Sequence, residues 1–123
     1  NDLCQYLMAA DRMNAAVTPY YQSFHPAMLS ILQQVADAFR AAGKPFCICG
    51  EMGGEPAFVL ALLGMGFRRL SMSPSRVAAV KRLIASVDRA EAETIAEKAL
   101  ELETADEVEA YLRAELSRLC GAE

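Results

Sequence analysis

Apolar side chains recur along residues 1–87 with two different spacings, and each spacing predicts one kind of element. Residues 3–10 form a short apolar stretch that suits a helix, whereas residues 18–23, with a proline and paired tyrosines, resemble a loop. From Pro26 the apolar positions follow helical spacing until Gly43, a residue type that commonly ends helices. We therefore expect a mostly loop-like opening segment followed by one long helix.

Two short apolar runs after this helix predict strands. Residues 45–49 are followed by three closely spaced glycines, the pattern of a buried strand that leads into a loop rich in bare backbone. We expect a helix over residues 56–64, a second strand over residues 67–72, and a further helix that Ser73 caps and Pro74 begins. The apolar face of this last helix is expected to comprise Val77, Val80, Ile84 and Val87.

Residues 88–123 form a second, helical segment of the chain. Asp88 with Glu91, and Thr104 with Glu107, have the spacing of a capping box, in which two residues at a helix start bond to each other's backbone. Strands that alternate with helices indicate parallel βαβ units, so the fold class is α/β. Two strands are too few for a finished parallel sheet, which predicts a piece of a larger barrel or doubly wound sheet.

Composition limits the class of protein. With 123 residues the chain has about half of the roughly 250 residues of a complete (β/α)8 barrel. A composition of 54% hydrophobic and 23% charged residues indicates a folded domain. The net charge of −4 offers no basic field for nucleic acid, and no apolar run reaches the roughly 20 residues that span a bilayer. We expect neither nucleic acid nor membrane as a partner.

Cysteine usage and the first residues add two expectations. The four cysteines lack a paired disulfide spacing, which indicates reduced thiols in the cytoplasm. The chain opens on Asn1-Asp2 without an initiator methionine or a signal-like segment, so we expect a start that has been cut from a longer chain.

The residues best placed for chemistry follow the first predicted strand. Cys49, Gly50 and Glu51 stand at its carboxyl end, where α/β folds place their active sites. Strand alternation puts Cys47 and Cys49 on one face, the expected barrel interior, with Cys49 at the mouth and Cys47 deeper. The local pattern leaves three interpretations of Cys49 open: a small buried apolar residue, a thiol that meets substrate, and a metal ligand. No second cysteine pair or nearby histidine supports the metal ligand.

Several motifs, taken together, resemble one known family. These are NDLCQY and AADRMN within residues 1–14, ICGE and GGEP within 48–56, LLGMG at 62–66 and LSMSP at 70–74. In order and spacing they resemble enzyme I, the phosphoenolpyruvate–protein phosphotransferase of the bacterial phosphotransferase system. The cysteine motif also looks like that of pyruvate phosphate dikinase, but Gln5-Tyr6 and residues 11–14 favour enzyme I.

The resemblance implies a fold and an organisation. Residues 1–123 would be a partial phosphoenolpyruvate (PEP)-binding barrel domain, the C-terminal fragment of a (β/α)8 TIM barrel. Residues 1–87 would supply about the last two to three βα units, and residues 88–123 the C-terminal helices. Such a fragment leaves open sheet edges, so we expect it to self-associate or to form a homodimer.

The resemblance also implies roles for five residues. PEP gives its phosphoryl group to an enzyme histidine, and the enolate that remains is protonated at carbon to give pyruvate. Cys49 occupies the position of the acid, and a thiol with a pKa of about 8.5 can donate that proton. Asn1 and Arg12 would bind substrate, with Arg12 at the phosphoryl group. Asp2 would ligate Mg²⁺, and Gly50 would let the backbone approach the ligand.

Each role has a simpler alternative that the local pattern leaves open. Arg12 could pair with Asp11 on the surface, Asp2 could cap a turn or helix, and Asn1 could be merely the first residue. His25, the single histidine, precedes Pro26 and is expected to cap a helix, because the family's acceptor histidine lies in a separate N-terminal domain. Cys4 stands where the family usually has threonine.

The expected function is that of a longer parent protein. It would move phosphate from PEP to an enzyme histidine and on to a phosphocarrier protein, which would contact the missing N-terminal domain. This chain alone is expected to be inactive. The alternatives are a barrel of the pyruvate phosphate dikinase or PEP synthase type, and a non-catalytic dimerisation or regulatory fragment. The motifs do not separate a sugar-transport enzyme I from its nitrogen-regulatory paralogue.

Overall fold

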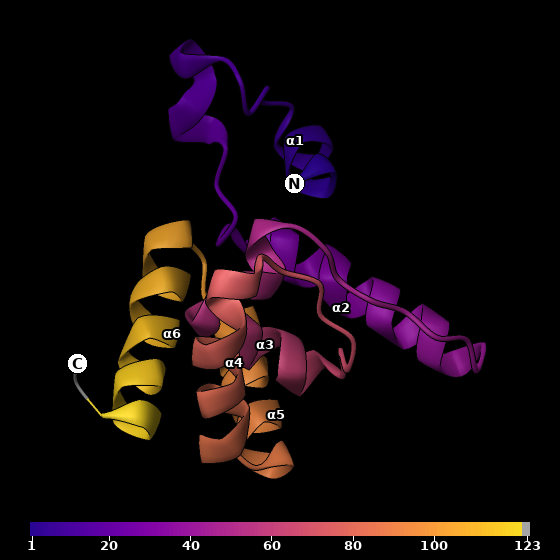
Figure 1. The fold of residues 1–123 in the computed structure, drawn as a ribbon. Coiled ribbons are helices and arrows are strands. Elements are labelled where there is room, and N and C mark those ends of the chain that lie inside the picture. Colours follow the sequence, from indigo (N-terminus) through magenta and orange to yellow (C-terminus); the bar gives the residue numbers. More distant parts are fainter. Residues whose placement is uncertain (122–123) are drawn as a thin grey trace.

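The computed structural model describes residues 1–121, and in these residues the chain is mostly helical (Figure 1). The elements, in order, are α1 (Asp2–Met8), the 3₁₀ helix η1 (Ala15–Tyr20), α2 (Pro26–Ala41), the 3₁₀ helix η2 (Glu51–Gly54), α3 (Pro56–Met65), α4 (Pro74–Ser86), α5 (Arg89–Leu100) and α6 (Ala105–Cys120). Helices α3 to α6 form a body, and the segment with α1 and η1 stands above it as an arm (Figure 1). No described helix combines the length and apolar character needed to cross a membrane.

Local signals in the sequence begin most of these helices. The predicted starts at Pro26, Pro56 and Pro74 are confirmed, since each proline occupies the first turn of a helix. His25 caps α2 as expected, with its Nδ1 accepting a hydrogen bond from the backbone N–H of Ala27 at 3.1 Å. These local residues therefore mark where α2, α3 and α4 begin.

The two helices after residue 88 begin at the predicted caps. Thr104 and Glu107 form the complete capping box, with each side chain bonded to the other residue's backbone. At Asp88 the carboxylate accepts a hydrogen bond from the N–H of Glu91 at 2.8 Å. The capping-box spacing thus located both helix starts correctly.

Residues 15–20 and the end of α3 differ from the prediction. The segment predicted as loop contains η1, which Asn14 caps by accepting a hydrogen bond from the N–H of Ala16 at 3.0 Å. Helix α3 runs past Gly64 to Met65, because Gly66, with a φ of 98°, is the residue that adopts the left-handed conformation at its end. Gly64 has another role, in packing.

The two predicted strands meet at a single point. Residues 45–49 and 67–72 are joined by one isolated parallel bridge between Ile48 and Leu70. The N–H of Ile48 donates to the carbonyl of Arg69 at 3.1 Å, and the N–H of Ser71 donates to the carbonyl of Ile48 at 2.9 Å. The parallel direction agrees with the predicted βαβ order, but residues 1–121 contain no continuous strand. A parallel pair is stable only inside a larger covered sheet, which these residues do not build.

Cys47 and Cys49 lie on one face of the first of these segments, as strand alternation predicted. Both are exposed, whereas Phe46, which precedes them, and Ile48, which lies between them, are partly buried against the core. The expectation that Cys47 occupies a deeper interior layer is therefore wrong for the described residues. A barrel interior requires strands on both sides, and only the Leu70 segment lies beside this one.

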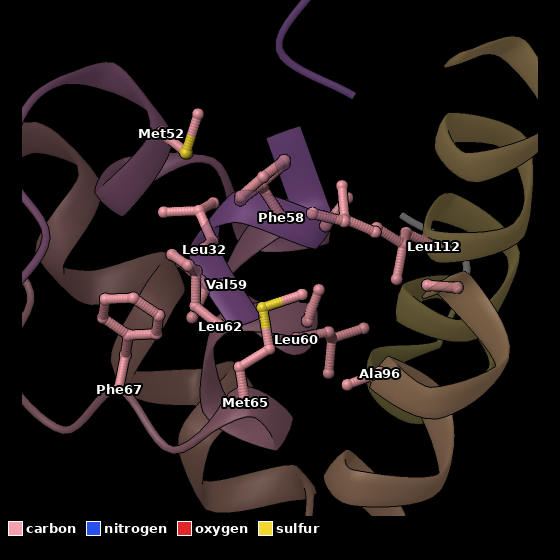
Figure 2. Close-up of a cluster of buried hydrophobic side chains, with 14 of the residues drawn as sticks. Leu32, Met52, Phe58, Val59, Leu60, Leu62, Met65, Phe67, Ala96 and Leu112 are labelled. Carbon is pink, nitrogen blue, oxygen red and sulfur yellow. The ribbon is translucent and has the colours of Figure 1, made fainter. Parts of the chain in front are cut away.

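Helix α3 is the centre of the core (Figure 2). Its side chains are apolar on every side, and those from Ala57 to Leu62, together with Met65, are fully buried. It packs most extensively on α5 and next on α6. A Cβ built on Gly64 would overlap the carbonyl oxygen of Ala92, so the glycine is what allows α5 to approach this closely. A helix that is hydrophobic all round is expected to be enclosed in this way.

Helix α4 buries a different set of side chains from the predicted face. Val80 and Leu83 are fully buried, but Val77 and Ile84 remain 42% and 47% exposed. The last two line a shallow apolar groove that also includes Leu70. The described residues include no element that covers this groove, so the predicted apolar face of α4 is only partly buried.

Candidate functional site

Asn1 and Gly50 lie against each other. Gly50 ends the extended segment that carries Cys49, and it has a φ of 88° and a ψ of −166°, a conformation that L side chains rarely adopt. A Cβ built on Gly50 would lie 3.2 Å from Oδ1 of Asn1. Asn1 stands at the N-cap position of α1, but its side chain makes no capping hydrogen bond. The amide of Asn1 therefore faces the cysteine loop instead of the helix.

Asp2 and Arg12 form an ion pair. A nitrogen of the Arg12 guanidinium lies 2.7 Å from Oδ1 of Asp2, and the two side chains are 40% and 81% exposed. The carboxylate of Asp11 instead accepts a hydrogen bond from the N–H of Met13 at 2.9 Å, so the alternative pairing of Arg12 with Asp11 is wrong. An exposed pair of this kind contributes at most about 1 kcal/mol. Both groups can consequently exchange partners at little cost, Asp2 for a cation and Arg12 for an anion.

Cys49 is an exposed thiol at the carboxyl end of its segment. The interpretation of Cys49 as a small buried core residue is therefore wrong. The loop behind it is held firmly, because Met52, Gly53 and Gly54 of η2 are buried. A Cβ built on Gly53 would lie 2.8 Å from the carbonyl oxygen of Ser71, so the loop packs directly on the second extended segment.

The five residues predicted for the site are joined by a short path of contacts. Asn1 touches Gly50, which follows Cys49, and Asp2, which follows Asn1, pairs with Arg12. Positions 1–12 and 49–50 thus come together although a long helix separates them in the chain. Chemically, these residues carry an exposed thiol, an amide and a carboxylate–guanidinium pair.

Asp2 is the carboxylate among the five residues predicted for the site. Among residues 1–121, no three histidine, cysteine, aspartate or glutamate side chains gather as a metal-binding group. The Asp2 carboxylate is nevertheless of the type that Mg²⁺ prefers, and Mg²⁺ commonly takes one or two carboxylates together with substrate oxygens. Asp2 can therefore supply one of several ligands.

Tyr21 is a site neighbour that the sequence reasoning missed. Its hydroxyl donates a hydrogen bond to the backbone carbonyl of Asn1 at 3.1 Å. Burial and the neighbouring Cys4 thiol raise the pKa of Tyr21, and Asp2 adds to this effect. Cys4 is itself buried, which raises its pKa. The paired tyrosines at 20 and 21 were visible in the sequence, but not which of them turns toward Asn1.

Arg113 of α6 also reaches the end of the cysteine loop. Its guanidinium lies 3.4 Å from Glu55, the N-cap residue of α3, and 2.7 Å from Glu109. It also stands over the ring of Phe24, 5.8 Å from the ring centroid. Glu109 is the main cause that raises the pKa of Arg113. The C-terminal helix thereby braces both the loop and the segment that leads into α2.

Known proteins resemble this chain along most of its length. The model of the PEP-binding domain of PEP-utilising enzymes matches residues 1–89. Over 118 residues the chain is 43% identical to a protein of Escherichia coli K12 named "Phosphoenolpyruvate-dependent phosphotransferase system". This match covers 96% of this chain and 16% of the relative. Over 108 residues the chain is 42% identical to the "Phosphoenolpyruvate-protein phosphotransferase" of Staphylococcus carnosus. This match covers 88% of this chain and 19% of the relative.

A third relative has a different name. It is a "Multiphosphoryl transfer protein" of Escherichia coli O6:H1, 43% identical over 114 residues, with 93% of this chain and 14% of the relative covered. This chain thus spans less than a fifth of the length of each of these three relatives.

Proposed function

Because the chain belongs to the family of PEP-utilising enzymes, whose PEP-binding domain it matches, we propose that it is the PEP-binding part of a phosphoenolpyruvate–protein phosphotransferase. The full-length protein moves the phosphoryl group of PEP to one of its own histidines and then to a phosphocarrier protein. The observation that carries this proposal is the path of contacts from Cys49 through Gly50 and Asn1 to the Asp2–Arg12 pair. The names of the relatives support the same reaction.

Arg12 and Asp2 act on the phosphate in this proposal. Arg12 leaves Asp2 and binds the phosphoryl oxygens, where a guanidinium stabilises the charge as the phosphorus–oxygen bond of PEP breaks. Asp2 would then be one of the residues that hold Mg²⁺. Bound there, Mg²⁺ would neutralise negative charge on the phosphate. The exposed, weak ion pair fits this exchange of partners.

Cys49 completes the conversion to pyruvate. The histidine nitrogen forms a bond to phosphorus, and the enolate oxygen leaves with the electron pair of the broken bond. The carbon end of the enolate then takes a proton from the Cys49 thiol, and the thiolate recovers a proton from solvent. Exposure of Cys49 at the end of its segment permits both proton transfers.

The rest of the protein supplies what these residues lack. We propose a (β/α)8 barrel in which residues 45–49 and 67–72 become neighbouring parallel strands, and the parallel bridge between Ile48 and Leu70 supports this register. In the isolated chain the edges of these segments stay open, and we propose that copies associate through them. Free cysteines fit a cytoplasmic, reducing location for the full-length enzyme.

Phosphoryl transfer from labelled PEP tests the proposal. We expect the full-length protein, with Mg²⁺ and a phosphocarrier protein, to label the carrier and release one pyruvate for each phosphoryl group moved. The chain of residues 1–123 alone should label nothing. If the full-length protein released no pyruvate from PEP under these conditions, the proposed function would be wrong.

A further inference from the structure

The carbonyl oxygen of Asn1 accepts two hydrogen bonds from different parts of the arm. One comes from the N–H of Gln5 at 3.0 Å and forms the first turn of α1. The other comes from the hydroxyl of Tyr21 at 3.1 Å, from beyond η1. The start of α1 is thus tied both to its own helix and to the segment that returns toward the body.

Tyr21 is held in turn by buried contacts. Tyr21 is partly buried against the core cluster that includes Cys4 of α1, whose side chain is 1% exposed. The backbone N–H of Tyr21 also donates to the carbonyl of Thr18 at 3.0 Å, at the end of η1. The phenol ring therefore has little freedom, and its hydroxyl defines where the Asn1 carbonyl can lie.

We propose that Tyr21 is a positioning residue, which through the Asn1 carbonyl holds the side chains of Asn1 and Asp2 in register with the Cys49–Gly50 loop. This inference rests on the proposed function, because it assigns Asn1 to the substrate and Asp2 to the metal. Without the Tyr21 hydroxyl, α1 keeps its helical hydrogen bonds but can turn at its start. The amide of Asn1 then loses its fixed place beside Gly50.

Substituting Tyr21→Phe in the full-length protein separates positioning from packing, because phenylalanine keeps the ring and lacks the donor. We expect the KM for PEP and the Mg²⁺ concentration for half-maximal activity to rise about two- to tenfold, the range for losing one hydrogen bond. The kcat should change much less, since Cys49 is not moved. The matched control is Tyr20→Phe, which alters an adjacent tyrosine that is 67% exposed and should leave both constants unchanged.

Thermal unfolding of the same variants completes the test. The inference predicts that Tyr21→Phe and Tyr20→Phe melt at similar temperatures while only Tyr21→Phe changes KM and the Mg²⁺ requirement. Equal KM values for PEP and equal Mg²⁺ requirements in the two variants would overturn the inference. So would a lower melting temperature and lower kcat with an unchanged KM, the signature of a purely structural role. A wild-type protein without activity toward PEP would instead refute the proposed function itself, and the positioning role with it.

Discussion

Gly50 combines a backbone conformation that favours glycine with a contact to Asn1, one of the residues proposed to bind substrate. Its φ of 88° and ψ of −166° lie where nearly all residues other than glycine are strained, and the side of Gly50 on which a Cβ would project faces Asn1. A side chain here would both strain the loop and push the amide of Asn1 away. Both effects act beside Cys49.

We expect Gly50→Ala to destabilise the full-length protein by about 1–3 kcal/mol and to weaken PEP binding as well. Gly43→Ala is the control, because Gly43 also has a positive φ, of 62°, but a Cβ there would meet nothing within 4 Å. Urea unfolding and PEP titration measure the two effects. Should Gly50→Ala bind PEP as tightly as Gly43→Ala does, the contact with Asn1 would have no part in substrate binding.

At this scale the sequence supplied the site residues through motif resemblance and not through their contacts. It placed Cys49 at a segment end, where the structure finds it exposed, and located His25 correctly as a cap. It offered Asp11, and not Asp2, as a surface partner of Arg12, and it missed Tyr21. Both depend on how the arm folds back on itself, which no local spacing records.

Helices α3 and α5 form the tightest contact between elements. Gly64 lies on the face of α3 that meets Ala92 and Ala96 of α5, and a Cβ at this position would overlap backbone atoms of Ala92. A rigid backbone cannot move aside as a flexible side chain does. The two helices must separate if the glycine is replaced.

Gly64→Ala should therefore destabilise the protein by about 2–3 kcal/mol, as expected for overpacking a core. The sign is informative, because replacing glycine by alanine in a helix interior normally stabilises by about 0.5–1 kcal/mol. Urea unfolding gives the free-energy difference. A gain in stability would mean that α3 and α5 do not pack as closely as the structure shows.

The capping box of α6 makes stability depend on pH. The hydroxyl of Thr104, with the backbone N–H groups of Glu103 and Thr104, lowers the pKa of Glu107. Its carboxylate therefore stabilises the fold above the ordinary glutamate pKa of about 4.3, and this contribution disappears as pH falls through the lowered value. Between neutrality and acid, wild type should thus lose more stability than Glu107→Gln does.

Melting temperatures across this pH range measure the difference, with Glu101→Gln as a control on an exposed glutamate outside the box. Thr104→Ala should also cost about 1 kcal/mol near neutral pH, because the helix loses its cap. Parallel pH profiles for wild type and Glu107→Gln would contradict the role given to the carboxylate.

Element starts could be predicted from the sequence because caps and prolines act locally. Strands could not, because a parallel strand exists only when neighbours on both sides complete its hydrogen bonds. Residues 45–49 and 67–72 carry the right apolar pattern yet form one bridge. The same lack of neighbours leaves Val77 and Ile84 of α4 exposed, although their spacing indicated a buried face.

At the scale of the whole molecule, residues 1–121 build one helical core, and the five residues proposed for the site lie outside it. The buried side chains around α3 form this core (Figure 2), whereas the arm with α1 and η1 stands above the body (Figure 1). The relatives from Escherichia coli K12 and Staphylococcus carnosus are much longer than this chain, whose matches cover 16% and 19% of their lengths. The family was accordingly predictable from the sequence, whereas the two strands predicted for an α/β sheet are joined in residues 1–121 by only one parallel bridge.

Pyruvate formation by the full-length protein tests the central claim most directly, with Cys49→Ala compared against Cys47→Ala. Both cysteines are exposed on the same face of one short segment, so the two variants differ only in which thiol is lost. We predict that Cys49→Ala binds PEP normally but forms pyruvate about 10²–10⁴-fold more slowly, the usual effect of losing a general acid, while Cys47→Ala stays near wild type. Unchanged pyruvate formation in Cys49→Ala, or an equal loss in both variants, would contradict the assignment of Cys49 as the proton donor.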